Sequence, residues 1–264
     1  MTRTVYQIGN RGDFIIFHWF MYIIAALKEV EHLQKPVFFN IKDDNRRHEK
    51  IYEYINTTIN LLKPDYEYID KIEDTDKVIL INEPYLISTS DVQDKYYHFL
   101  RNQILLKNNL ESDIIPNKFT YISRCNKLFP KSSYARRQII NEDEFTNKLI
   151  DMGFNVIHLE NYNLLEKIKI FQESKLIVTP NGGALIMGLF ANKNIKVIEI
   201  HDTKSPNEDQ YNHIFKVLDI PIIRYTNVTS VDINNNQISP GINTDYNYII
   251  NNPSELVNFI KDNI

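Results

Sequence analysis

The 264-residue chain contains one cysteine, Cys125, so it cannot form an intrachain disulfide. Cysteine usage therefore gives no sign of an oxidising compartment, and a cytoplasmic location is expected. Glycine is also scarce, with seven residues, a bias that by itself indicates no function. The chain is nevertheless long enough to bury one large core or two modest ones without disulfides or metals.

Long apolar runs are lacking as well. The most apolar segment, residues 14–27, is shorter than the roughly twenty residues that a membrane-spanning helix needs. Asp13 precedes this segment instead of a basic leader, and Lys28 and Glu29 follow it, which argues against a signal peptide. We therefore expect a buried helix here and no transmembrane segment.

Excess charge of either sign is absent. The formal net charge is -4, and the hydrophobic and charged fractions of 43% and 24% are those of an ordinary globular protein. The sequence therefore gives no electrostatic reason to expect nucleic acid or an anionic membrane as a partner. A small molecule or a glycan is the expected ligand.

Short apolar runs alternate with longer amphipathic ones, which is typical of repeated βαβ units. The expected strands are 5–8, 37–39, 78–81, 119–123, 155–159, 176–179, 196–200 and 222–225. The expected helices are 14–33, 48–62, 91–107, 142–152, 164–172, 184–191, 207–218 and 254–260. A polar stretch, 108–118, separates the halves, and 226–245 is expected to be loop. The fold class is therefore α/β with parallel sheets, in two Rossmann-like lobes, 1–114 and 115–264, and the last helix is a candidate to pack back on the first lobe.

The segment Thr179-Pro180-Asn181-Gly182-Gly183 lies between a predicted strand and a predicted helix. Ligands of open α/β sheets bind at such positions, where helix N-termini present free N–H groups and partial positive charge. Two glycines would let the backbone approach an anion closely. The alternative is a plain tight turn.

Two other strand ends carry polar residues that suit the same pocket. Arg124 directly follows strand 119–123, where a guanidinium can bind phosphate, although a solvated loop residue is the alternative. Glu199 ends another strand and could accept hydrogen bonds from ribose hydroxyls, unless it is an exposed carboxylate. Arg136 and Arg137 add cations just before a predicted helix.

A structural explanation is also available for one pair near these arginines. Asn141 as N-cap and Glu144 three residues later have the spacing of a capping box. This explanation does not extend to the arginines. With Arg124 they would handle a nucleoside diphosphate without a metal.

In this order the motifs resemble glycosyltransferase family 61, whose members transfer sugars such as xylose or N-acetylglucosamine from nucleotide donors. The matching residues are Ser123-Arg124, Arg137, Asn141-Glu142, Gly153-Phe154, Pro180-Asn181-Gly182-Gly183-Ala184-Leu185 and Glu199. In the first lobe, Asn10 and His18-Trp19-Phe20 look like the family's Asn and His-aromatic segment. The resemblance thus touches both lobes and is firmer in the second.

The resemblance implies a GT-B architecture with the donor in the C-terminal lobe and the acceptor on the N-terminal lobe. It also implies inversion at the anomeric carbon, with no metal or other cofactor, a UDP-sugar as the first choice of donor and a glycan or polysaccharide as acceptor. The residues expected to bind the donor are Arg124, Arg137, Asn141, Pro180, Asn181, Gly182, Gly183, Ala184 and Glu199.

Two departures from the family pattern affect the expected chemistry. Asn181 stands where the family usually has histidine, and it can donate a hydrogen bond but cannot carry a proton. Tyr22 stands where an acidic residue is common, and a phenol is a poor base at neutral pH. Asp13 and His18 are the substitute candidates for the catalytic base, although a helix N-cap and a core histidine are the structural alternatives.

Two other functions stay open at this point. The string Gly9-Asn10-Arg11-Gly12-Asp13 also resembles the start of polysaccharide pyruvyltransferases, which likewise have two α/β lobes. The departures at Tyr22 and Asn181 would suit a non-catalytic nucleotide-sugar-binding protein. The order of motifs in the second half favours the glycosyltransferase.

Overall fold

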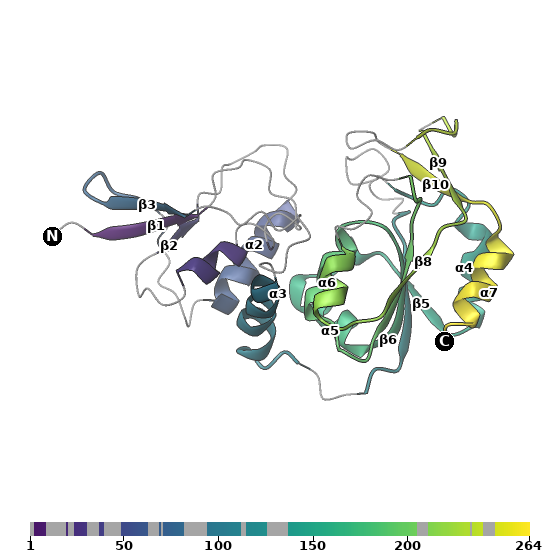
Figure 1. Ribbon diagram of the computed structural model, residues 1–264, viewed down its shortest axis with the longest axis horizontal. Helices are drawn as coiled ribbons and strands as arrows, with labels where there is room; N and C mark the ends of the chain where they lie inside the picture. The colour runs from purple at the N-terminus through teal and green to yellow at the C-terminus, as the bar shows by residue number, and fades with distance from the viewer. Residues whose placement is uncertain are drawn as a thin grey trace. The chain divides into compact units, whose positions relative to one another are not determined.

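The computed structural model divides the protein into two compact units, Met1–Glu111 and Ser112–Ile264 (Figure 1). The described residues are 3–8, 20, 24–30, 37–39, 49–62, 69, 71–81, 94–111, 115–125, 137–204, 211–232, 234–239 and 246–264. Asp13, His18 and Tyr22 lie outside them, as do Arg136 and most of the predicted helix 14–33. Within the described parts of the chain, no helix is long and apolar enough to span a membrane.

The first unit contains a three-stranded parallel sheet with the strand order β2-β1-β3. Its strands are β1 (Thr4–Ile8), β2 (Val37–Phe39) and β3 (Lys77–Ile81). Its helices are the 3-10 helix η2 (Ala25–Glu29), α2 (Glu49–Leu62), α3 (Asp94–Arg101) and the π-helix η4 (Asn102–Leu106). Val5 and Ile8 are fully buried, as expected for the apolar positions of a central strand.

The second unit contains a five-stranded parallel sheet with the order β5-β4-β6-β7-β8. Its strands are β4 (Lys118–Ile122), β5 (Phe154–Ile157), β6 (Ser174–Pro180), β7 (Lys196–Ile200) and β8 (Ile222–Tyr225). Each strand lies within a few residues of its prediction because buried parallel strands are rich in apolar residues and stand out from the amphipathic helices between them. The prediction of an α/β fold with parallel sheets is confirmed.

Helices cover both faces of this sheet (Figure 1): α5 (Leu164–Glu173) and α6 (Asn212–Val217) lie on one face, and α4 (Asp143–Asp151) and α7 (Pro253–Lys261) on the other. Two further 3-10 helices, η5 (Leu159–Asn161) and η6 (Gly183–Phe190), follow β5 and β6. Helix α5 starts at a capping box, in which the Asn163 side chain accepts from the Glu166 amide and the Glu166 carboxylate accepts from the Asn163 amide. This reciprocal pair fixes where α5 begins.

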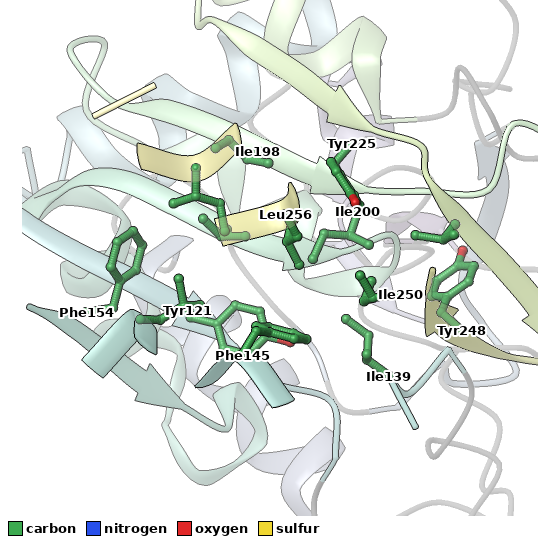
Figure 2. Close-up of a cluster of buried hydrophobic side chains, with 14 of the residues drawn as sticks. Tyr121, Ile139, Phe145, Phe154, Ile198, Ile200, Tyr225, Tyr248, Ile250 and Leu256 are labelled. Atoms are coloured by element: carbon green, nitrogen blue, oxygen red, sulfur yellow. The ribbon is translucent and has the colours of Figure 1, made fainter. Parts of the chain in front are cut away.

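One hydrophobic cluster of the second unit lies between the sheet and the α4/α7 layer (Figure 2). Tyr121 of β4 packs edge to face on Phe145 of α4, with the ring centroids 5.6 Å apart. Both side chains are fully buried, and burying one such ring stabilises the fold by about 1.5–3 kcal/mol. This packing holds the carboxyl end of β4 in place.

Two predictions for this unit are wrong. The stretch predicted as loop contains strand β9 (Val228–Val231), which pairs antiparallel with β10 (Asn247–Ile250). Its short sequence, Val-Thr-Ser-Val, alternates too briefly to be recognised as a strand. The capping box at Asn141 is not formed: α4 has Glu142 as N-cap, without a side-chain cap hydrogen bond. Asn141 bonds to β10 instead, through contacts that the local sequence does not reveal.

Candidate functional site

The strand order of the second unit places a ligand-binding position between β4 and β6. In sequence, β4 precedes β5 and β6, yet β4 lies between them in the sheet. The chain therefore passes from β4 to β5 on one side and then crosses to β6 on the other side of β4, so the strand order reverses between β4 and β6. Open α/β sheets bind ligands outside the carboxyl ends of the strands at such a switch point. The residues that follow these two strands are Ser123-Arg124 and Asn181-Gly182.

Gly182 and Arg124 come into direct contact at this position. A Cβ atom built on Gly182 would lie 2.1 Å from Nη1 of Arg124 and 3.6 Å from Nη1 of Arg137. Gly182 also has a φ of 154° and a ψ of -169°, a backbone conformation that is essentially restricted to glycine. The structure therefore brings both predicted arginines to the glycine loop, and Gly182 makes room for them.

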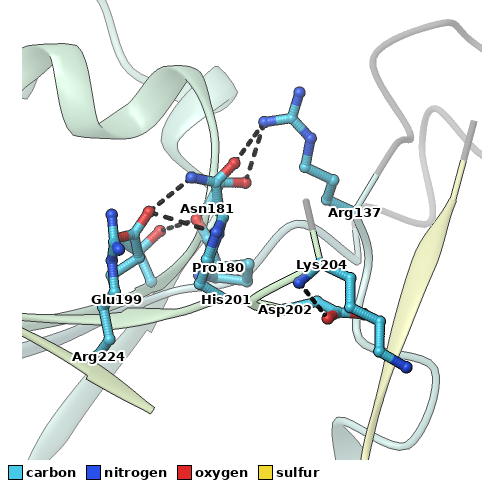
Figure 3. A network of polar contacts seen from close by, with 9 residues as sticks. Arg137, Pro180, Asn181, Glu199, His201, Asp202, Lys204 and Arg224 are labelled. Carbon is cyan, nitrogen blue, oxygen red and sulfur yellow. Dashed lines mark hydrogen bonds and ion pairs between the residues drawn. The ribbon is translucent and has the colours of Figure 1, made fainter. Parts of the chain in front are cut away.

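A chain of hydrogen bonds connects Arg137 to the interior of the sheet (Figure 3). Nη1 of Arg137 donates to Oδ1 of Asn181 at 2.8 Å, and Nδ2 of Asn181 donates to Oε1 of Glu199 at 2.6 Å. Nε of Arg224 donates to the other carboxylate oxygen of Glu199 at 3.0 Å. Asn181 thus has a fixed orientation, with its amide oxygen held toward Arg137.

The burial of Asn181 and Glu199 bears on their predicted contacts with the donor. Both side chains are fully buried, and their hydrogen bonds go to protein groups. The alternative that Glu199 is an exposed strand-end carboxylate is therefore wrong. Direct contact of Asn181 or Glu199 with a donor stays a prediction, whereas their effect on Arg137 is visible in the structure.

Three of the other predicted donor residues belong to the same loop, and the fourth, Asn141, does not. Pro180 ends β6, and Gly183 and Ala184 form the exposed first turn of η6, where N–H groups lack intrahelical acceptors. Asn141 lies further along the segment that contains Arg137. Its side chain donates to the carbonyl of Ile250 at 3.0 Å and accepts from the Ile250 amide at 2.9 Å.

A buried carboxylate anchors the strand end that carries Arg124. Oε1 of Glu142 accepts from the Tyr121 hydroxyl at 2.5 Å, and Oε2 accepts from the Ser123 hydroxyl at 2.7 Å. The Ser123 hydroxyl in turn accepts from the Cys125 amide at 3.1 Å. Glu142 thus holds both neighbours of Arg124, Ser123 directly and Cys125 through the Ser123 hydroxyl. These contacts restrict where the Arg124 guanidinium can reach.

The two arginines concentrate positive charge at this site, and both side chains are partly buried. Burial lowers the pKa of Arg124, and the neighbouring charge of Arg137 lowers it further. Guanidinium groups stay protonated in proteins, so the charged Arg124 bears a cost of burial and, in addition, repulsion from Arg137. An anion bound between them would relieve this repulsion.

Glu199 has a pKa raised above its ordinary value because burial disfavours the carboxylate more than Asn181, Arg224 and Arg137 favour it. The folded state therefore binds a proton more tightly than the unfolded state. This contribution to stability is fully present below about pH 4.5, the unfolded value, and is lost as pH rises through the folded pKa.

We therefore expect wild-type protein to lose stability relative to Glu199→Gln as pH rises above about 4.5, the unfolded value. The glutamine has the same shape and does not titrate, so the difference between the two proteins isolates this one carboxyl group. Urea unfolding at a series of pH values measures it. A difference that does not change with pH, or a wild-type protein that gains stability relative to Glu199→Gln as pH rises, would contradict the assignment.

Three residues around the site were not predicted: Arg224, Tyr211 and Tyr246. Arg224 pairs with Glu199 across β7 and β8, and Arg137 lies over the Tyr246 ring with Cζ 5.9 Å from its centroid. The Tyr211 hydroxyl forms a hydrogen bond with Arg137, and burial raises its pKa. Of these three residues, Arg224 alone had a signal in the sequence. It is a charged residue within the otherwise apolar strand Ile222–Tyr225, and a charge there needs a buried partner.

A cavity of about 420 Å³ lies elsewhere in the second unit. It is lined by residues that include Lys118 and Ser174, which begin β4 and β6, and Lys169 of α5. It therefore lies along α5 and reaches from the amino ends of β4 and β6 to Ile157, the last residue of β5. Its lining contains no residue that follows β4 or β6 at the switch point. The rule for open α/β sheets gives no reason to assign the donor to it.

Comparison with known proteins agrees with the motif order on which this site rests. The family model described as Glycosyltransferase 61 matches residues 16–198. This range includes every predicted donor residue except Glu199, which lies one position beyond it. No curated protein matches the chain. Because the family model covers more than half of the sequence, the chain belongs to glycosyltransferase family 61 and is a glycosyltransferase.

Proposed function

We propose that the protein is an inverting, metal-independent glycosyltransferase of GT-B architecture that transfers a sugar from a nucleoside diphosphate donor to a glycan acceptor. The observation that carries the proposal is the convergence of Arg124 and Arg137 on Gly182 at the switch point. Two guanidinium forks beside free backbone N–H groups suit the two phosphates of such a donor. A hexose or a pentose, carried by UDP as the first choice, would satisfy this arrangement.

The arginines would act on the leaving group of the transfer. The acceptor hydroxyl oxygen forms a bond to the anomeric carbon while the bond from that carbon to the diphosphate oxygen breaks on the opposite face. The hydroxyl proton passes to a base, and the departing diphosphate gains negative charge. Arg124 and Arg137 would stabilise this charge as it develops.

The first unit would supply the catalytic base and the acceptor site. Asp13 and His18 are the proposed sources of the base, and both lie outside the described residues. Each unit has a parallel sheet in which the first strand lies between the next two strands of the sequence, and this shared topology supports two Rossmann-like lobes of the GT-B type. We propose that the acceptor binds to the first unit. We propose the cytoplasm as the compartment and polysaccharide synthesis as the setting.

Incubation with nucleotide sugars tests the proposal. We expect release of nucleoside diphosphate from one UDP-, GDP- or dTDP-sugar, dependent on a glycan acceptor and undiminished by EDTA. Consumption of phosphoenolpyruvate without any use of nucleotide sugars would identify a pyruvyltransferase instead. Nucleotide binding without transfer to any acceptor would identify a non-catalytic binding protein.

A further inference from the structure

Arg137 has an unusual backbone conformation, which the end of the chain maintains. Its φ is 61°, in the left-handed region that residues other than glycine rarely adopt. The Arg137 amide donates to the carbonyl of Tyr246 at 2.7 Å. Two further backbone hydrogen bonds, from Tyr248 to Gln138 and from Ile140 to Tyr248, extend this pairing along β10.

Asn247 adds a side-chain contact at the residue next to Arg137. Its Oδ1 accepts from the Gln138 amide at 3.1 Å, across 109 residues of sequence. The adjacent residue, Tyr246, places its ring beneath the Arg137 guanidinium. Tyr246, the residue that precedes β10, thus contacts both ends of Arg137: its carbonyl accepts from the backbone amide, and its ring lies at the guanidinium.

We infer that Asn247 is a positioning residue for the donor site, acting through Arg137. The inference rests on the proposed function, because it assigns to Arg137 a contact with the donor diphosphate. Without the Asn247 acceptor, the Gln138 amide loses its partner and the Arg137 backbone can leave the left-handed region. The guanidinium then spends less time against Asn181 and Gly182.

The test is a double-mutant cycle on nucleotide affinity, with UDP, GDP and dTDP as probes and the matching nucleosides for comparison. Asn247→Ala is expected to weaken diphosphate binding by about three- to tenfold, the effect of losing one neutral hydrogen bond. Nucleoside binding should change less than twofold. In an Arg137→Ala background, Asn247→Ala should have no further effect on affinity, whereas a general loss of fold would lower affinity in both backgrounds.

Thr229→Val is the matched control, because it removes a hydrogen bond of 2.8 Å between Thr229 and Asn251 in the same pair of strands. It should leave diphosphate affinity unchanged. If Asn247→Ala does not fold, Asn247→Ser replaces it, since serine is too short to reach the Gln138 amide. Equal effects of the Asn247 change with and without Arg137 would overturn the inference. An Arg137→Ala protein that binds diphosphate normally would instead overturn the proposed function.

Discussion

Replacement of Arg124 by alanine is expected to weaken nucleoside diphosphate binding by about ten- to a hundredfold, because a charge-assisted hydrogen bond contributes about 1.5–3 kcal/mol. The guanidinium lies directly against the glycine loop at the switch point. Isothermal titration of the wild-type and variant proteins measures the change. Product formation should fall at least as much, because the same group would stabilise the leaving diphosphate.

Two further variants separate charge from geometry. Arg124→Lys keeps the charge but loses the planar fork, so its affinity should lie between those of the wild type and the alanine variant. Lys169→Ala removes a surface cation that pairs with Glu173 at 3.8 Å and lines the 420 Å³ cavity along α5. It should leave affinity unchanged. If Lys169→Ala weakened binding as much as Arg124→Ala, general electrostatic attraction would replace the specific site.

Replacement of Gly182 by alanine should have the second large effect. The new methyl group would stand 2.1 Å from Nη1 of Arg124, and alanine would also have to adopt a φ of 154°. The backbone conformation alone should cost about 1–3 kcal/mol of folding stability. Because Arg124 must move aside, diphosphate affinity should fall by about tenfold or more.

Gly183 provides the matched control for stability. A Cβ atom on Gly183 would meet nothing within 4 Å, and its φ is not in the left-handed range. Gly183→Ala should therefore change the free energy of unfolding by less than about 1 kcal/mol. Chemical denaturation of both variants measures the contrast. Equal losses at the two positions would show that the loop needs flexibility rather than space for the arginine.

Much of the fold could be predicted from the sequence because its signals are local. The strands β6 and β7 each contain a short apolar run, Leu-Ile-Val in β6 and Val-Ile in β7, and the glycine pair marks the turn that follows β6. The strands β9 and β10 could not be predicted, because they are short and partly polar and their pairing depends on contacts distant in sequence. The same reason explains the wrong capping box at Asn141, whose partner is 109 residues away.

The candidate site could be predicted in composition but not in arrangement. Arg124, Arg137 and Gly182 follow from motif order, and the structure places them together. The sequence did not indicate that Glu199 would be fully buried between Asn181 and Arg224, because this depends on the register between β7 and β8. In the structure, Glu199 orients Asn181 and, through it, Arg137. Its contact with a ribose stays a prediction.

Arg124, Arg137 and the glycine loop at Gly182 form the proposed diphosphate site. Thermal denaturation with UDP, GDP and dTDP, each compared with its own nucleoside, tests this proposal most directly, because a ligand that binds the folded state stabilises it by RT ln(1 + [L]/Kd). We predict that, at a ligand concentration close to the wild-type Kd, at least one nucleoside diphosphate raises the melting temperature of the wild-type protein, that its nucleoside does not, and that Arg124→Ala removes most of the rise. Equal stabilisation by the nucleoside, or a rise in Arg124→Ala as large as in the wild type at the same concentration, would contradict the proposal.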